Sequence, residues 1–147
     1  MRGPWVGVSS GSQGWLLLRV MTLLAAVRLA LWCLPFDWVR RRAPIVRVRS
    51  ARLASVPVSR LSWAVRVAGR ACPGASCLTQ ALAMQRLLAR AGHRSELRLG
   101  VALDSGCGLQ SHAWVVQDGR VVLGEGADLH RYAPMPVDAS ASCSRVP

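Results

Sequence analysis

The chain has 147 residues, of which 52% are hydrophobic, and its formal net charge is +12. That length is enough for one domain with a buried core, and that hydrophobic content excludes an intrinsically disordered chain. All 19 basic residues are arginine, and no acidic residue lies between Val39 and Ser95. Such a stretch of purely positive charge would attract an acidic peptide, a nucleic acid or an anionic membrane. The tryptophans are scattered rather than interleaved with the arginines, so we expect no specific nucleic-acid binding.

The N-terminal third contains the most apolar part of the chain, residues 15–36, after a Gly/Ser-rich segment, 1–14, that predicts a flexible N-terminus. The apolar run is long enough for a transmembrane helix. Arg19 and Arg28 would then both lie in hydrocarbon, each at a cost of about 2.5–3.5 kcal/mol. We therefore expect a buried or interface helix, ended by the proline that follows. Membrane contact through residues 15–36 is the alternative, with Arg40–Arg42 facing the anionic lipid.

The cysteines indicate the compartment. There are five of them, an odd number, and no small-residue cleavage site of a signal peptide follows the apolar run. We expect reduced thiols and a cytoplasmic protein, with peripheral attachment to the membrane as the alternative.

The middle of the chain gives weaker signals. Residues 45–49 alternate like a strand, but a loop or a short helix fits equally well. Ser59 is expected to cap a helix over residues 60–70. The domain organisation expected from these patterns is a helical region over residues 15–70, a catalytic core over 71–138 and a disordered tail over 139–147.

A helix with a cysteine at its start is the clearest local signal in the second half. Leucines follow Cys77 at helical spacing, and Gly92 is suited to the C-terminal cap. The unpaired N–H groups and the dipole at a helix N-terminus favour a thiolate, which is the form of cysteine that acts as a nucleophile.

Strand patterns follow this helix. Residues 96–103 alternate, residues 111–116 form a second apolar run, and Asp118-Gly119 predicts a hairpin into residues 120–123. Helices followed by an antiparallel meander indicate an α+β fold. We predict a transglutaminase- or papain-like core, with the nucleophile helix packed on a small antiparallel sheet and preceded by N-terminal helices.

In such a core His112 would reach the Cys77 sulfur and act as its base, and an acidic group would orient the imidazole. Glu125 is the first candidate for that acid and Asp128 the second, whereas Asp118 fits turn chemistry better. Two further residues are candidates for contact with the substrate. Gln80, one helical turn after Cys77, could also hold an oxyanion, and Trp114 could instead belong to the core.

A zinc site made of Cys72, Cys77, Cys107 and His112 is the less favoured hypothesis, because the spacing lacks a second cysteine pair. We expect no metal and no cofactor.

The second half resembles the transglutaminase-like cysteine protease of lasso-peptide biosynthesis, which is the protease half of a split leader-peptidase B protein. The segments that carry the resemblance are 73–83, 87–93, 97–101 and 111–115, with Asp118-Gly119 after them. The N-terminal helix with Leu34-Pro35-Phe36 is also similar, so the resemblance covers roughly residues 15 to 135.

The resemblance implies a peptidase that removes the leader from a ribosomally synthesised precursor peptide. A separate recognition-domain protein would present the leader, and an ATP-dependent, asparagine-synthetase-like cyclase would close the lasso ring. Cys77 would be the nucleophile and His112 the general base. The acid of that family falls at the position of Gly124 in this chain, and Glu125 follows one residue later.

Two other functions fit the same residues. One is a non-catalytic or membrane-associated basic adaptor, in which the thiol is structural. The other is transglutaminase-like amide transfer to an amine, which uses the same three groups.

Overall fold

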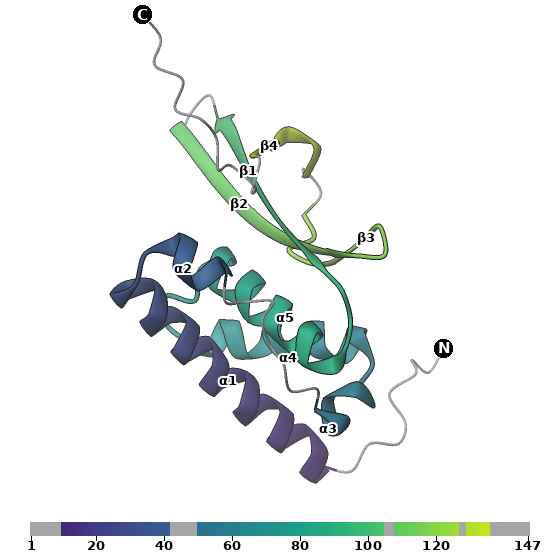
Figure 1. Cartoon of the computed structure of the whole chain (residues 1–147). Helices are drawn as coiled ribbons and strands as arrows, with labels where there is room; N and C mark the ends of the chain where they lie inside the picture. Colours follow the sequence, from purple (N-terminus) through teal and green to yellow (C-terminus); the bar gives the residue numbers. More distant parts are fainter. Residues whose placement is uncertain (1–9, 42–49, 105–107, 127–128, 136–147) are drawn as a thin grey trace, which may run out of the picture.

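The computed structural model describes residues 10–41, 50–104, 108–126 and 129–135. Within these residues, five α-helices precede an antiparallel sheet of four strands, and Figure 1 shows α5 between that sheet and α1. This is the α+β fold predicted from the sequence. The elements are α1 (Ser10–Cys33), α2 (Phe36–Arg41), α3 (Ala51–Ala54), α4 (Val58–Ala71), α5 (Cys77–Ala91), β1 (Glu96–Asp104), β2 (Gly108–Gln117), β3 (Arg120–Leu123), the 3-10 turn η1 (Leu129–Arg131) and β4 (Ala133–Met135).

Helix α1 is buried along one face only. Leu16, Val20, Leu24 and Val27 are 0–2% exposed and lie three or four residues apart, so they form a stripe that packs on α4 and α5. The opposite face is also apolar but stands in solvent. The segment Gln13–Cys33 is long and apolar enough to span a membrane by length and composition, and 28% of it is buried. One stripe of this helix is thus buried and the rest is exposed, so the choice between a buried or interface helix and membrane contact stays a prediction.

The start of α1 differs from the sequence prediction. The helix begins at Ser10, inside the segment 1–14 that was expected to be flexible. Residues 1–9 and the predicted tail, 139–147, lie outside the described residues. Because α1 and α4 share one hydrophobic cluster with α5, the predicted helical region and the predicted core pack as one unit.

Helix α4 begins two residues earlier than expected. Its first residue is Val58, so Ser59 lies inside the first turn and is not the cap. Pro57 occupies the cap position with φ −58°, a value that the proline ring fixes and that leads directly into a helix. The alternating residues 45–49 lie outside the described part of the chain.

Helix α5 is the central element. Ser76 caps it by accepting a hydrogen bond from the Thr79 N–H at 3.3 Å, and Gly92 ends it with φ +90°. Its side chains fill the layer between the sheet and α1. It also fixes α2, because Arg86 Nη2 donates to the Val39 carbonyl at 3.3 Å. Burial, and then the neighbouring Arg90, lower the pKa of Arg86.

The sheet has the strand order β3-β2-β1-β4. The β2–β3 hairpin turns at Asp118 and Gly119, both with positive φ, as in the type I′ turn that the sequence predicts. Strand β4 was not predicted, because it has only three residues and contains a proline at the edge of the sheet. Ala113 and Val115 belong to the cluster that packs on the helices, so their neighbours on β2 point to the other face.

The topology sets which ends of α5 and β2 lie together. Strand β1 starts a few residues after α5 ends, and Glu96 at its start pairs with Val116 near the end of β2. The late part of β2 therefore lies at the C-terminal end of α5. His112, in the earlier half of β2, is displaced toward the end of α5 that begins with Cys77.

The turn between α4 and α5 is held from two sides. Arg28 Nη1, from α1, donates to the Gly74 carbonyl. Gln80 Nε2, from α5, donates to the Ala75 carbonyl at 3.1 Å. Two consecutive carbonyls of one turn are thus bound by side chains from two helices, which fixes the backbone that leads into Cys77.

Replacing Arg28 with alanine tests this contact. We expect Arg28→Ala to lower the free energy of unfolding by about 1 kcal/mol, because the Gly74 carbonyl loses its donor. Urea denaturation followed by circular dichroism measures the change. Arg98→Ala is the matched control, since Arg98 makes only an exposed ion pair with Glu96, at 3.1 Å, and should cost less than about 0.5 kcal/mol. Equal losses in the two variants would contradict the role of Arg28.

Candidate active site

Cys77 is the first residue of α5 and is half-buried beside the hydrophobic core. The first N–H groups of any helix have no acceptor within that helix. Here the Thr79 and Gln80 N–H groups both donate to Ser76. Among the described residues, the Cys77 and Leu78 N–H groups have no such acceptor. They are therefore the donors that could bind an oxyanion formed next to the sulfur.

Gln80 has a different environment from the one the sequence suggested. Its amide group lies against Gly69 of α4, so closely that a Cβ at Gly69 would come within 2.6 Å of it. Its nitrogen is used by the Ala75 carbonyl. The side chain thus packs between α4 and the turn before Cys77, where it holds the backbone that leads into Cys77. Its contact with an oxyanion or a substrate stays a prediction.

The His112 ring is oriented by a backbone carbonyl. Its Nε2 lies 3.0 Å from the Gly124 oxygen. A carbonyl only accepts hydrogen bonds, so Nε2 must carry the proton of this bond. In the neutral imidazole the lone pair is then on Nδ1, which is the nitrogen that can act as a base.

Gly124 can occupy this position because it has no side chain. Its φ is +83°, and a Cβ would lie 2.8 Å from both the Ala113 oxygen and the Trp114 Cβ. Any other residue would push the chain away from β2. The carbonyl of this glycine is thus the group that binds the His112 ring.

Two aromatic rings flank His112. The Trp114 ring is stacked, with a centroid separation of 6.1 Å, and the Tyr132 ring lies at 5.3 Å with a 35° tilt. Trp114 is only 7% exposed, which leaves little of its ring for a substrate. Tyr132 was missed in the sequence, because it lies 20 residues after His112 and no local pattern connects them.

Gly100 makes room for these rings. It pairs directly with His112 across β1 and β2. A Cβ at this position would lie 2.8 Å from the Tyr132 Cβ and 2.9 Å from the Trp114 ring. A glycine in the middle of an alternating strand marks such a close approach, and this is the one sequence signal that could have pointed to the cluster.

Cys77 and His112 lie at the same end of the α5–β2 unit but are not hydrogen-bonded to each other among the contacts of the described residues. His112 is on the face of β2 opposite to Ala113, which packs on the helices. Beyond the β2–β3 pairs at Val115–Gln117, the Gly124 carbonyl lies beside this part of β2 and binds the imidazole. The described residues thus do not show the contact between His112 and Cys77 that the sequence predicts, and that contact stays a prediction.

The three acids considered for the third position have separate locations. The Glu125 carboxylate lies 3.6 Å from Arg66 of α4, and both side chains are about half exposed. Asp118 is in the β2–β3 turn, six residues along the chain from His112, or about 20 Å at the rise of a strand. Asp128 lies outside the described residues. Within those residues the ring nitrogen of His112 is bound by the Gly124 carbonyl and not by a carboxylate.

Within the described part of the chain, no group of three or more His, Cys, Asp or Glu side chains could hold a metal ion. Cys107, one of the four residues of the zinc hypothesis, lies outside that part.

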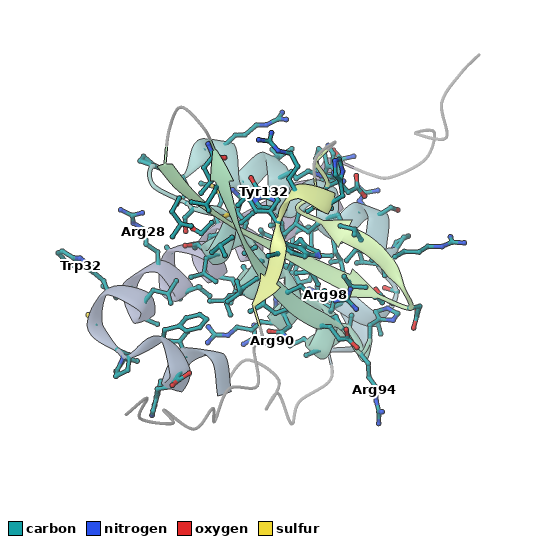
Figure 2. All side chains as sticks on the ribbon, turned by 90° about the horizontal axis from the view of Figure 1, so that it is seen from above. Arg28, Trp32, Arg90, Arg94, Arg98 and Tyr132 are labelled. Atoms are coloured by element: carbon teal, nitrogen blue, oxygen red, sulfur yellow. The ribbon has the colours of Figure 1, made fainter. Side chains whose placement is uncertain are left out.

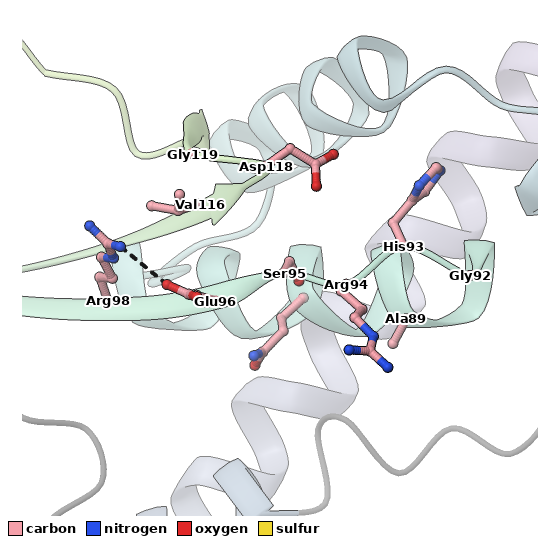
Figure 3. Close-up of a pocket in the computed structure, with 11 residues that line it drawn as sticks. Ala89, Gly92, His93, Arg94, Ser95, Glu96, Arg98, Val116, Asp118 and Gly119 are labelled. Carbon is pink, nitrogen blue, oxygen red and sulfur yellow. Dashed lines mark hydrogen bonds and ion pairs between the residues drawn. The ribbon is translucent and has the colours of Figure 1, made fainter.

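The opposite end of α5 has a cavity of about 840 Å³, shown in Figure 3. His93 and Arg94, after the helix, and Asp118, in the hairpin turn, are among its lining residues. Neither Cys77 nor His112 lines it. This charged cavity is thus at the far end of the helix from the predicted nucleophile.

The family pattern of the transglutaminase-like superfamily matches residues 17–137, which includes α1 from residue 17 onward and every described helix and strand from α2 to β4. The chain belongs to the transglutaminase-like superfamily. No curated protein and no solved structure matches it. A transglutaminase-like domain agrees with the α+β core predicted from the sequence. The superfamily includes cysteine peptidases. The match includes the N-terminal helices, so in this transglutaminase-like chain α1 is part of the domain.

Gly100→Ala tests the arrangement of the rings around His112 in this transglutaminase-like domain. The added Cβ would overlap Tyr132 and Trp114, so we expect a loss of about 1–3 kcal/mol in the free energy of unfolding. We also expect a change in the near-ultraviolet circular dichroism of the two rings. Gly126→Ala is the control, because a Cβ there meets nothing within 4 Å. An unchanged stability and spectrum for Gly100→Ala would show that the rings do not meet at this glycine.

Proposed function

We propose that this protein is a cysteine peptidase that removes the leader from a ribosomally synthesised lasso-peptide precursor. The observation that carries the proposal is the hydrogen bond from His112 Nε2 to the Gly124 carbonyl at 3.0 Å. This bond uses the proton on Nε2 and leaves Nδ1 as the basic nitrogen of the ring. His112 lies on β2, and β2 packs against α5, the helix that starts at Cys77. Membership of the transglutaminase-like superfamily and the resemblance in segments 73–83 and 111–115 support the same reaction class.

The reaction begins with proton transfer from the Cys77 thiol to His112 Nδ1, when substrate binding brings the two groups into hydrogen-bond contact. The thiolate attacks the scissile carbonyl carbon and forms a C–S bond. The Cys77 and Leu78 N–H groups stabilise the resulting oxyanion. As the C–N bond breaks, the imidazolium gives its proton to the amine of the core peptide, which leaves.

The leader is then bound to Cys77 as a thioester. His112 takes a proton from a water molecule, the hydroxide adds to the thioester carbon, and the C–S bond breaks. The leader leaves as a carboxylic acid and the thiol is restored. Transfer to an amine in place of water would give amide transfer, so the identity of the acceptor separates the peptidase from the transglutaminase-like alternative.

Two groups compete for the role of the third member. The Gly124 carbonyl already accepts the His112 hydrogen bond, whereas the Glu125 carboxylate is paired with Arg66. The existing contact favours the carbonyl for orienting the ring. Glu125 is the group that would stabilise the imidazolium if it exchanged Arg66 for His112.

The proposal includes partners. The precursor would be presented by a separate leader-recognition protein, and an ATP-dependent, asparagine-synthetase-like cyclase would act on the released core. The acid-free region between Val39 and Ser95 supports electrostatic attraction of an acidic peptide or partner.

A cleavage assay tests the nucleophile. The precursor peptide encoded beside this gene is mixed with its recognition protein and the full chain, and mass spectrometry follows release of the leader. We expect Cys77→Ala to lower cleavage by at least about a thousandfold, because the covalent step is lost. Cys33→Ala, which removes an exposed thiol at the end of α1, should cleave within about twofold of wild type. Equal cleavage by folded Cys77→Ala would remove the nucleophile assignment.

Glu125→Gln decides between the two groups at the third position. If the Gly124 carbonyl orients His112, cleavage by this variant should stay within about threefold of wild type, since the carbonyl contact is unaffected. Arg66→Gln serves as the companion variant, because it breaks the same ion pair and keeps the carboxylate. A loss of about a hundredfold or more in Glu125→Gln alone would make Glu125 the third member that the sequence suggested.

A further inference from the structure

A groove lies between the C-terminal half of α1 and the turn that precedes Cys77. Its volume is about 760 Å³, within the size range of sites that bind small molecules or side chains. Ala25, Leu29 and Trp32 of α1 form one wall, and Pro73 and Ser76 are part of the other. Leu29 is 61% exposed and Trp32 is 88% exposed. Figure 2 shows Trp32 pointing outward from the molecule, next to Arg28.

The wall formed by α1 has no partner within the described chain. The buried stripe of α1 is on its other side, so the packing of the fold does not explain why leucine and tryptophan are exposed here. A concentrated exposed apolar surface of this kind is typical of a binding site. The groove has a second wall, formed by the turn before Cys77, and is therefore not a flat surface. This shape suits the insertion of a single apolar side chain.

The groove is continuous with the candidate active site. Ser76, which lines it, is the residue directly before Cys77 and caps the same helix. Helices α1 and α5 pack on each other, and the axes of packed helices lie about 8–10 Å apart. An extended peptide covers that distance with about three or four residues. A substrate whose scissile bond is at Cys77 can thus place a side chain three or four residues away in this groove.

The turn between the groove and Cys77 is also rigidly held. Arg28 binds the Gly74 carbonyl from the groove side, and Gln80 binds the Ala75 carbonyl from the α5 side. Occupation of the groove is therefore linked to the position of the nucleophile through one short turn.

We propose that this groove is a specificity subsite that binds an apolar side chain of the substrate peptide, three or four residues from the scissile bond. The proposal rests on the proposed peptidase function and adds the chemistry that the enzyme selects in its substrate. Leu29 and Trp32 contact the bound side chain, and the Pro73–Ser76 turn aligns the following backbone with Cys77.

Photocrosslinking of the full chain tests the subsite. Leu29 is replaced by the photoreactive residue p-benzoylphenylalanine in the Cys77→Ala background, and the precursor peptide is added with its recognition protein. The matched control places the same residue at Leu18, which is 65% exposed. Leu18 is eleven residues before Leu29, so it lies on nearly the same face of α1 but about 16 Å away.

We expect the precursor to crosslink at position 29 at least about tenfold more than at position 18, as burial of one large apolar side chain implies. Mass spectrometry should map the crosslink to within about four residues of the cleavage point. Equal yields at the two positions, or crosslinks only to the recognition protein, would overturn the proposal. Crosslinking of both positions only to lipid, in vesicles with anionic headgroups, would also overturn it and favour membrane contact.

Kinetics separates failure of the subsite from failure of the peptidase. Leu29→Asp should raise KM about tenfold with little change in kcat, and Leu18→Asp should leave both within about twofold. If wild type cleaves and Leu29→Asp cleaves equally well, the subsite is wrong and the peptidase stands. If wild type does not cleave, the peptidase proposal fails. The crosslink at position 29 then still reports whether the groove holds the peptide.

Discussion

Two side-chain donors that bind two consecutive carbonyls fix the turn before Cys77, and the site depends on this constraint. Arg28 holds the Gly74 carbonyl and Gln80 holds the Ala75 carbonyl. Because one donor is on α1 and the other is on α5, the helical layer positions the first residue of α5. This contact also gives a role to an arginine within an otherwise apolar helix. A charge that argues against membrane insertion serves here to connect α1 to the turn.

Among the described residues, His112 is held by backbone and aromatic contacts rather than by a second charge. The Gly124 carbonyl sets the tautomer of His112, and Trp114 and Tyr132 flank the ring. A carbonyl orients an imidazole as a carboxylate does, but it stabilises the charged form less, because it has only a partial charge. The faces of the aromatic rings attract a cation and offset part of this difference. The site therefore relies on position more than on charge.

The parts of the fold that could be predicted are those whose signals are local. The glycine that ends α5 directly follows the helix sequence, and the Asp118-Gly119 pair is sufficient to predict its hairpin. Long-range contacts had no such signal. Tyr132 meets Gly100 and His112 only after the chain crosses the sheet, and β4 is too short to show a pattern. The group that binds His112 is a main-chain oxygen. Every residue has one, so the sequence could not show which residue would provide it. Pro57 was overlooked as the start of α4 because Ser59 is the stronger cap by residue type.

The central claim is that Cys77 is an activated thiol served by His112. The most direct test is the rate of iodoacetamide alkylation of each cysteine near neutral pH, measured by peptide mapping in wild type and in His112→Gln. Accessibility alone would make the exposed Cys33 react faster than the half-buried Cys77. The account predicts the reverse order in wild type, and loss of the Cys77 advantage in His112→Gln. Slower alkylation of Cys77 than of Cys33 in folded wild-type protein would contradict it.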